Sequence, residues 1–201
     1  MLCCMKRSFE TLIATYIENK IGISEDFLSD TLANHLKNNL LALYQRELLV
    51  AAGTGNADKL IHNSAVRSDV IYWLDKKHNN PYENDFFVQI EAFISYLNQS
   101  CYAGITSYEF HYSLYETGSF YKKHLDQFQD NSSRQFSIIS YLNANWVEKD
   151  GGELLIHQLG NNQKIAPIQG KTVFFKSNEL EHEVLVTHER RMSITGWLKR
   201  D

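Results

Sequence analysis

The stretch YEFHYSLYETGSFYKKHLD, residues 108–126, decides the fold class of this chain. It opens with a short run rich in aromatic residues and ends with a histidine and an aspartate in the pattern His-x-Asp. The second half of the chain contains more segments of this kind, each bounded by turn residues. The predicted strands are Tyr108–Tyr115, Phe136–Leu142, Glu153–Leu159, Lys171–Phe175, Glu183–Thr187 and Met192–Leu198. Short strands at this spacing are typical of a β-sandwich or barrel.

The first half of the chain has instead the periodicity of amphipathic helices. A helix that ends near Gly22 is predicted by the apolar stripe Phe9, Leu12, Ile13, Tyr16 and Ile17. A longer helix from Ser24 is predicted by leucines at every fourth position, Leu28, Leu32, Leu36 and Leu40. A third helix follows Pro81, with one face formed by Phe86, Phe87, Ile90, Phe93, Ile94 and Leu97. Val66–Leu74, between the second and third helices, is predicted to form a short strand.

The composition is that of a soluble globular domain. The chain has 201 residues, of which 43% are hydrophobic and 22% charged, and it contains only two prolines. Because no composition break divides it, we predict a single domain over residues 1–201. The predicted fold class is α+β, with a helical buttress over about residues 8–100 and a β-sandwich core, a double-stranded β-helix or jelly roll, over about residues 105–199.

The net charge, the apolar stretches and the cysteines limit which kinds of partner and compartment are expected. The net charge of −4 supplies no basic field, so nucleic acid is not expected as a partner. No stretch approaches the ~20 apolar residues that a membrane helix needs, and the N-terminus has no signal-peptide pattern. Cys3, Cys4 and Cys101 match neither a disulfide framework nor a zinc-binding spacing. These features predict a cytoplasmic protein with free thiols and no membrane partner.

His124-Leu125-Asp126 is the first candidate metal-binding motif. On a strand, residues i and i+2 point to the same side, so an imidazole and a carboxylate converge there. Taken alone, the motif is short enough to be a chance pair of surface residues. His182, on a separate strand, can supply a third ligand. Two histidines and one carboxylate on one face of a metal form the facial triad of non-haem Fe(II) oxygenases.

Arg191 is the second candidate for a functional role. Strand alternation places Arg191, Ser193, Thr195 and Trp197 on one face, and Met192 and Ile194 on the other. An arginine that points into the interior needs an anionic partner, because an unpaired buried charge is costly. A dicarboxylate co-substrate held by the guanidinium fork would supply that partner. A structural ion pair is the alternative.

From about Val66 to Trp197 the motifs form an ordered set. They are Arg67-Ser68-Asp69 with Trp73, Tyr115 to Tyr121 before His124-Leu125-Asp126, Arg134, Tyr141-Leu142-Asn143 with Trp146, Gly151 to Leu154, His182-Glu183-Val184, and Arg191 to Trp197. This set resembles the Fe(II)- and 2-oxoglutarate-dependent dioxygenases. Within them it is similar to the hypoxia-inducible-factor-type prolyl 4-hydroxylases and their single-domain bacterial relatives.

The resemblance implies roles for particular residues. His124, Asp126 and His182 would bind Fe(II). Arg191 and Tyr141 would hold the distal carboxylate of 2-oxoglutarate, although Tyr141 can also be a core aromatic residue. Thr195 would lie near the metal, and Tyr115 would occupy the co-substrate pocket, although Leu114 stands at the family's tyrosine position. The residues implied to line a protein-substrate groove are Arg67, Asp69 and Arg134.

The resemblance also implies a reaction and a partner. The expected co-substrates are 2-oxoglutarate and O2, with ascorbate as a reductant, and the expected products are succinate, CO2 and a hydroxylated substrate. Both histidine ligands should be neutral imidazoles fixed by hydrogen-bond acceptors, and Leu154, Ile156 and Val184 should form an aliphatic wall. The implied substrate is a prolyl residue of an intracellular protein, with the translation machinery as a candidate source. An oxygen- or nutrient-linked regulatory role is a further hypothesis.

Several alternatives stay open at this point. A nucleic-acid demethylase of the AlkB type uses similar motifs, but it carries a second arginine where Trp197 stands here. A hydroxylase of a non-prolyl residue or small molecule, and a jelly-roll binding protein that has lost its metal, are the other two. The loop from Ala51 to Ala65 is either a mobile lid or a surface connection. His111, His157 and His188 are expected to be structural or solvated.

Overall fold

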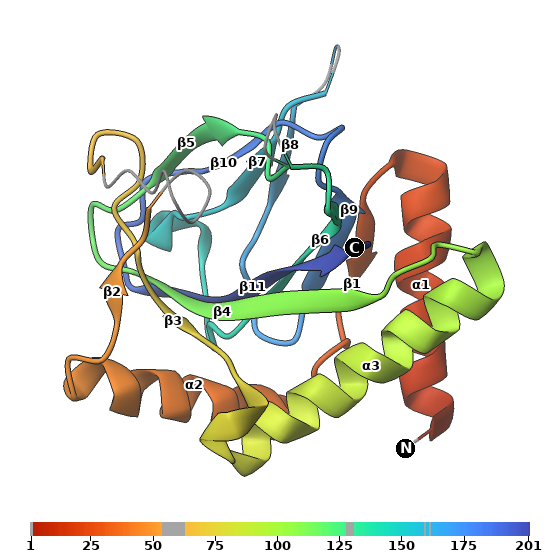
Figure 1. Cartoon of the computed structure of the whole chain (residues 1–201). Helices are drawn as coiled ribbons and strands as arrows, with labels where there is room; N and C mark the ends of the chain where they lie inside the picture. The colour runs from red at the N-terminus through yellow and green to blue at the C-terminus, as the bar shows by residue number, and fades with distance from the viewer. Residues whose placement is uncertain (1, 54–62, 128–130, 159, 161) are drawn as a thin grey trace.

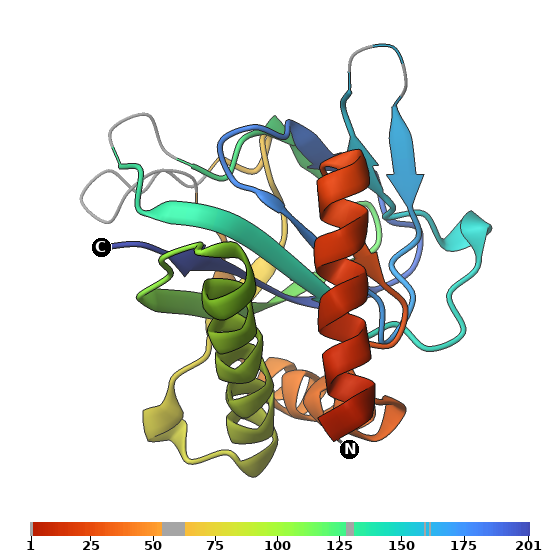
Figure 2. The same ribbon diagram turned by 90° about the vertical axis from the view of Figure 1, so that its right-hand side faces the viewer.

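The computed structural model describes residues 2–53, 63–127, 131–158, 160 and 162–201, and only the backbone of residues 2–5. Two antiparallel sheets face each other, and three helices cover the outer side of the larger one (Figures 1 and 2). This arrangement confirms the α+β jelly-roll class with N-terminal helices. None of the described helices is long and apolar enough to cross a membrane.

The three α-helices of the described residues are α1 (Leu2–Asn19), α2 (Asp30–Gln45) and α3 (Pro81–Cys101), and a 3₁₀ turn at Lys76–His78 precedes α3. The predictions of the first and third helices are confirmed. The predicted start of the second at Ser24 is wrong, because Gly22–Ser24 forms strand β1. The helix begins later, where the Ser29 side chain accepts a hydrogen bond from the Leu32 amide and caps the first turn.

The larger sheet has the strand order β1-β9-β6-β11-β4-β3-β2. Its other strands are β2 (Val50–Ala51), β3 (Val70–Trp73), β4 (Ser107–Tyr115), β6 (Arg134–Tyr141), β9 (Thr172–Lys176) and β11 (Arg191–Lys199). The smaller sheet has the order β5-β10-β7-β8. Its strands are β5 (Tyr121–His124), β7 (Leu154–Ile156), β8 (Gln163–Ile165) and β10 (His182–Val184).

Each predicted strand overlaps an observed one, but several bounds differ. Of the strand expected over Val66–Leu74, only the second half forms a strand, β3. Arg67, in the first half, makes an isolated bridge with Tyr121. The segment expected over Glu183–Thr187 begins one residue earlier and ends at Val184. Most of the predicted lid from Ala51 to Ala65, including Thr54, lies outside the described residues.

Two apolar clusters lie on opposite sides of the larger sheet. The first packs the helices against the sheet, and Ile194 of β11 and Leu114 of β4 belong to it. The second fills the space between the two sheets and includes Tyr115 and Tyr141. The predicted alternation along β11 is therefore confirmed, because Met192 and Ile194 face the helices while Arg191 and Thr195 line the cavity between the sheets.

The side chain of Phe93 on α3 packs between the helices and the sheet, so its removal tests how much this contact stabilises the fold. Its buried ring lies 5.2 Å from the ring centroid of Phe9 and 5.4 Å from that of Phe174 on β9. We expect Phe93→Ala to lower the free energy of unfolding by about 3–5 kcal/mol, through lost burial and an unfilled cavity. Urea denaturation measures this change. The matched control is Val88→Ala on the same helix, because Val88 is 62% exposed and should change stability by less than about 0.5 kcal/mol.

Candidate metal centre

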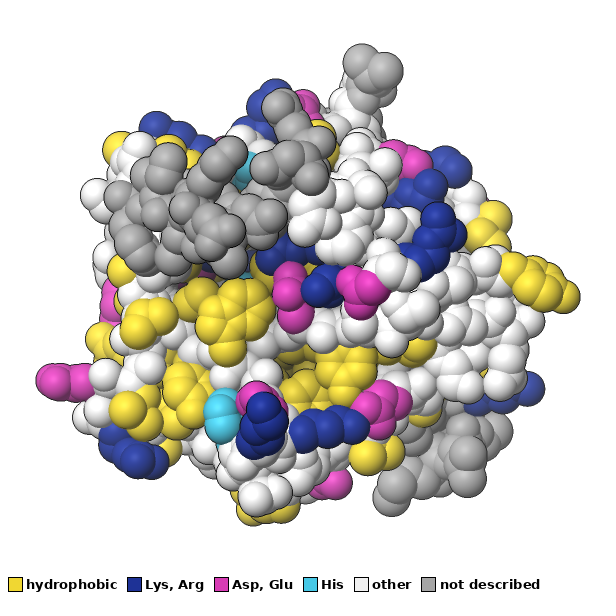
Figure 3. Space-filling view, viewed as in Figure 1, with side chains coloured by type: hydrophobic (Ala, Val, Ile, Leu, Met, Phe, Trp, Pro, Cys, Tyr) yellow, Lys and Arg dark blue, Asp and Glu magenta, His cyan; other side chains and the backbone are white. Residues whose placement is uncertain are grey.

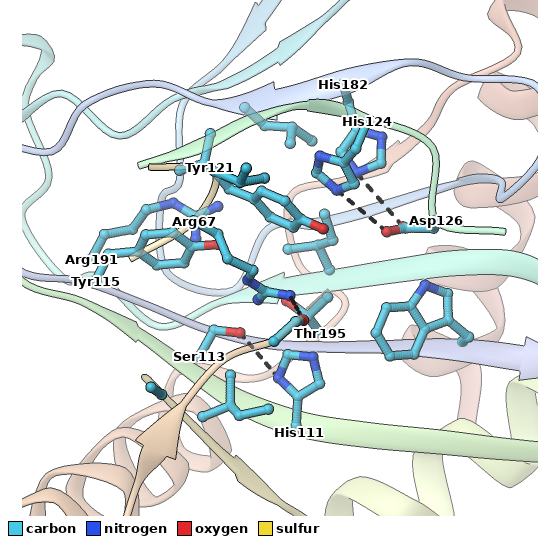
Figure 4. A pocket seen from close by; sticks show the side chains of 18 of the residues that line it. Arg67, His111, Ser113, Tyr115, Tyr121, His124, Asp126, His182, Arg191 and Thr195 are labelled. Carbon is cyan, nitrogen blue, oxygen red and sulfur yellow. Dashed lines mark hydrogen bonds and ion pairs between the residues drawn. The ribbon is translucent and has the colours of Figure 1, made fainter. Parts of the chain in front are cut away.

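A cavity of about 460 Å³ opens between the two sheets. Its lining comes from both of them: β4, β11 and β3 contribute one wall, and β5, β7 and β10 the other. Figure 4 shows that the side chains of His124, Asp126 and His182 meet at one end, and that Arg191 and Tyr115 lie together elsewhere in the same cavity. The cavity therefore contains both groups of residues that the sequence singled out.

His124 and His182 are brought together by strand pairing. β10 runs antiparallel to β5, with His182 directly opposite His124. The Nε2 atoms of His124 and His182 lie 3.5 Å and 3.6 Å from the two carboxylate oxygens of Asp126. One ligand atom from each of the three residues lies within 4.8 Å of the others. The three side chains thus converge as the sequence predicted.

Asp126 reaches the two histidines in a different way from the predicted one. The His-x-Asp motif does not lie within a strand, because β5 ends at His124 and Asp126 follows in a bend. The Asp126 carboxylate is instead oriented by the larger sheet, where the Ser137 hydroxyl of β6 donates a hydrogen bond of 2.6 Å to it. Asp126 is therefore held from the opposite wall of the cavity.

Each histidine has its tautomer fixed by the backbone. The Nδ1 of His124 lies 2.7 Å from the carbonyl oxygen of Lys122, and that of His182 lies 3.0 Å from the carbonyl oxygen of Leu180. Because a carbonyl oxygen can only accept, Nδ1 carries a proton in both rings, so in the neutral form of each ring Nε2 is the nitrogen with the lone pair. This confirms the expectation of imidazoles fixed by acceptors.

The charge states also fit a metal. Burial lowers the pKa of His182 to about 4, although the nearby Asp126 carboxylate opposes this. Burial also acts to raise the pKa of Asp126, but the neighbouring imidazoles of His182 and His124 and the hydrogen bond from Ser137 outweigh it and hold that pKa well below its usual range. At neutral pH the group therefore offers one carboxylate and a neutral imidazole lone pair, the donors that a two-histidine, one-carboxylate Fe(II) site requires.

Arg191 is a buried cation that has no carboxylate partner among the described residues. It is 3% exposed, its Nε donates to the carbonyl oxygen of Gly152 at 2.8 Å, and Nη1 lies 3.4 Å from the Ser193 hydroxyl. Within the ranges that the structure describes, no carboxylate forms an ion pair with it. The alternative of a structural ion pair therefore has no support. Gly152 allows the Arg191 side chain to pass close to the backbone at this point, since a Cβ there would lie 3.0 Å from the Arg191 Cδ.

Two tyrosines flank the Arg191 guanidinium. Its Cζ lies 4.9 Å from the Tyr115 ring centroid and 5.1 Å from that of Tyr141. Burial raises the pKa of Tyr141 to about 12, while the Arg191 charge acts in the opposite direction. The Tyr141 ring belongs to the core, but its buried hydroxyl makes no hydrogen bond of normal geometry with any described residue. The guanidinium and this hydroxyl form a donor pair that suits an incoming carboxylate.

The three residues expected in a substrate groove occupy different places. Arg67 donates through Nε and Nη2 to the two Asp69 oxygens at 2.8 Å and 2.7 Å, so buried Asp69 neutralises Arg67. Arg67 and Arg134 line the cavity. Arg134 pairs with Glu109 at 2.7 Å, and its Cζ lies 3.4 Å from the Trp197 ring centroid.

Several residues that line the cavity were not predicted from the sequence to do so. Tyr121 stacks on His124 with 3.6 Å between ring centroids, although the motif before the histidine included it without a role. His111 also lines the cavity, because it faces inward from β4, and its burial agrees with the expected structural histidine. His157 pairs with Glu183, and His188 is exposed, as expected.

The predicted aliphatic wall is confirmed in part. Leu154 and Val184 line the cavity, and Ile139 joins them. Ile156 packs in the core between the sheets instead. Thr195 lines the cavity on β11, and its hydroxyl lies 3.3 Å from that of Ser193.

Comparisons with known proteins agree with this geometry. Residues 110–199 match the family model of the 2OG-Fe(II) oxygenase superfamily. A prolyl-4-hydroxylase from Pseudomonas putida superposes with a TM-score of 0.86 at 28% identity, covering 96% of this chain and 99% of that one. A prolyl hydroxylase from Trichoplax adhaerens, solved with a peptide fragment of the hypoxia-inducible factor, superposes with a TM-score of 0.87 at 23% identity, covering 98% and 91%.

A further neighbour catalyses a different reaction. The alpha-ketoglutarate-dependent epimerase SnoN from nogalamycin biosynthesis superposes with a TM-score of 0.66 at 13% identity, covering 95% of this chain and 82% of that one. At this identity the likeness shows the fold alone. The shared fold therefore does not by itself decide the substrate.

The metal centre can be tested without turnover. We expect the protein to bind one equivalent of Co(II) at neutral pH, measured by calorimetry and by the visible absorption of the bound ion. His182→Ala removes one donor and should weaken binding by about a hundredfold or more, since loss of even an outer partner typically costs 10–100-fold.

The matched control for the metal measurement is His188→Ala. His188 is an exposed histidine on the same segment of chain and should leave Co(II) affinity unchanged. Equal affinity of the His182→Ala variant and the wild-type protein would show that the three residues are not the metal site.

Proposed function

We propose that this chain, which resembles the 2OG-Fe(II) oxygenases, is an Fe(II)- and 2-oxoglutarate-dependent dioxygenase that hydroxylates a prolyl residue of a protein. One observation carries the proposal: a complete two-histidine, one-carboxylate group shares a cavity with a buried arginine for which the described part of the chain offers no carboxylate partner. Members of the matched superfamily use Fe(II), 2-oxoglutarate and O2, and the donor set of this cavity suits the first two.

His124, Asp126 and His182 would hold the iron. Bound Fe(II), together with 2-oxoglutarate and O2, supplies the oxidation that turns a substrate C–H bond into a hydroxyl and releases succinate and CO2. The protein's part is to fix the ligands. The carbonyl oxygens of Lys122 and Leu180 hold both imidazoles with Nε2 toward the centre, and Ser137 orients the Asp126 carboxylate.

Arg191 and Tyr141 would bind the distal carboxylate of 2-oxoglutarate. The guanidinium retains donors beyond its bonds to Gly152 and Ser193, and the Tyr141 hydroxyl can add another. Tyr115 and Thr195, which both line the cavity, would lie beside the co-substrate. A dianion neutralises the buried arginine, so binding removes the cost of an unpaired charge.

The apolar part of the lining would protect the reaction. Leu154, Val184 and Ile139 line the same cavity with side chains that carry no polar atoms. Such a wall excludes water and strengthens the electrostatic interactions of the bound carboxylate.

The mouth of the cavity favours a polypeptide over a small polar substrate. Val50 and Trp73 line it and are 59% and 45% exposed. Figure 3 shows hydrophobic side chains together on the face that carries β2, β3 and β4. An exposed apolar rim of this kind suits a partner that covers it, such as an extended segment with a prolyl ring. The position of Trp197 beneath Arg134 also disfavours the AlkB-type alternative, which needs a second arginine there.

Co-substrate binding gives the first test of the proposal. We expect 2-oxoglutarate to bind Mn(II)-loaded protein, measured by calorimetry without O2. Arg191→Gln should weaken it by about a hundredfold, and Tyr141→Phe, which removes one hydroxyl, by about tenfold, since hydrogen bonds to charged groups contribute about 1.5–3 kcal/mol.

The neighbouring Arg190 provides the control for charge. It is exposed and pairs with Glu116, so Arg190→Gln removes the same charge outside the cavity and should leave the affinity for 2-oxoglutarate unchanged. An equal loss in both variants would mean that only overall charge matters, and would contradict the assigned carboxylate site.

Measuring turnover with peptides tests whether the substrate is a prolyl residue. Succinate release from 2-oxoglutarate should rise several-fold when prolyl peptides are added under air, and mass spectrometry should find one added oxygen on the peptide proline. Peptides with alanine in place of proline should not stimulate release. Stimulation by both kinds of peptide, or oxygen on another residue, would leave a dioxygenase but refute the prolyl target.

A further inference from the structure

His111 is a buried histidine on the cavity wall that the proposed metal and co-substrate sites do not use. It lies on β4 with Trp73 of β3 directly opposite on one side and Thr195 of β11 on the other. Its ring lies 5.1 Å from the Trp73 ring and 5.6 Å from the Trp197 ring, centroid to centroid. In Figure 4 its imidazole lies apart from His124 and His182, on the wall formed by β4.

The tautomer of His111 is fixed from behind. Nδ1 lies 3.1 Å from the carbonyl oxygen of Tyr112 and 3.1 Å from the Ser113 hydroxyl. Because the carbonyl oxygen can only accept, Nδ1 carries the proton and donates to it. Nε2 is then the unprotonated nitrogen, and it can only accept a hydrogen bond.

The surroundings keep this imidazole neutral. Burial lowers the pKa of His111 to about 4, and the charges of Arg67 and Arg134 act in the same direction, while Asp69 opposes them. No described residue donates a hydrogen bond to Nε2. The cavity therefore contains a hydrogen-bond acceptor, His111 Nε2, next to two indole rings, and a bound molecule can supply the donor.

The chemistry of proline indicates which donor fits. A prolyl residue has no N–H of its own, so the main-chain donor nearest to its ring is the amide N–H of the residue that follows. Indole rings pack well against an apolar pyrrolidine ring, and a single acceptor beside them can bind that one N–H.

We propose that His111 is a specificity-determining residue, whose Nε2 accepts a hydrogen bond from the amide N–H that follows the target proline. This inference rests on the proposed prolyl hydroxylase function. It adds a preference to the substrate: a secondary amide after the proline is favoured, and a Pro-Pro sequence at that position is disfavoured.

A pair of synthetic probes isolates this single hydrogen bond. The first is the blocked pentapeptide acetyl-Ala-Ala-Pro-Ala-Ala-amide. The second is its depsipeptide, in which an ester oxygen replaces the N–H after the proline. Binding to Mn(II)- and 2-oxoglutarate-loaded protein, without O2, is followed by tryptophan fluorescence, because Trp73 and Trp197 line the cavity. We expect the amide to bind roughly three- to tenfold more tightly than the ester, as a net hydrogen bond of about 0.5–1.5 kcal/mol implies.

Two variants assign the preference to His111. His111→Leu removes the acceptor at similar volume, so the ratio of the two affinities should fall to about one. His111→Gln places an amide oxygen near the position of Nε2 and should restore part of the preference. Because an ester also weakens the preceding carbonyl, the comparison between variants, rather than the wild-type ratio alone, carries the result. Circular dichroism and Co(II) binding verify that each variant is folded.

The outcomes separate the two proposals. A preference for the amide that is lost in His111→Leu and partly kept in His111→Gln supports the role of His111. Equal binding of amide and ester by the wild-type protein, or a preference that His111→Leu retains, overturns that role and leaves the prolyl target standing. If neither probe binds while Mn(II) and 2-oxoglutarate do, the prolyl target fails and the role of His111 fails with it.

Discussion

The antiparallel pairing of β10 with β5 is the constraint on which the rest of the site depends. It sets His182 opposite His124, and the local backbone turns the protonated nitrogen of each ring away from the centre. A shift of one residue in this pairing would send one imidazole to the outer face of the sheet. The register is secured on the other side of β10, where β7 pairs with it and places Leu154 and Ile156 in the apolar layer between the sheets.

The second constraint is the alternation of side chains along β4 and β11, the longest strands of the larger sheet. Leu114 and Ile194 pack under the helices, while their neighbours Ser113, Thr195 and Arg191 face the cavity. The helices therefore do more than cover a surface, because they hold the sheet in the orientation that aims these residues inward. The same alternation explains why Tyr115, and not Leu114, faces the cavity despite standing one position from the family's pattern.

The sequence predicted what strong periodicity and distinctive chemistry encode. The long strands, two of the helices and the convergence of His124, Asp126 and His182 were all expected. The short strands β1, β2, β5 and β8 were not, because a segment of two to four residues has too few alternations to be recognised and owes its form to the strand beside it. The position of His111 on the cavity wall was not predicted for a related reason, since the direction of a lone histidine in a strand is known only when its neighbours in space are known.

The arginines of the cavity show how its function is divided. Arg67 is neutralised by Asp69 and Arg134 by Glu109, so the chain itself supplies their partners, and their guanidinium planes are free to stack on Tyr121 and Trp197. Arg191 is more deeply buried than either, yet it is held only by a carbonyl and a hydroxyl among the described residues. Among the described residues two of these cations are balanced internally and the third has no carboxylate partner, which favours the proposed binding of an anionic ligand at Arg191. Under this proposal, the same difference would separate a co-substrate end of the cavity from an end that faces the substrate.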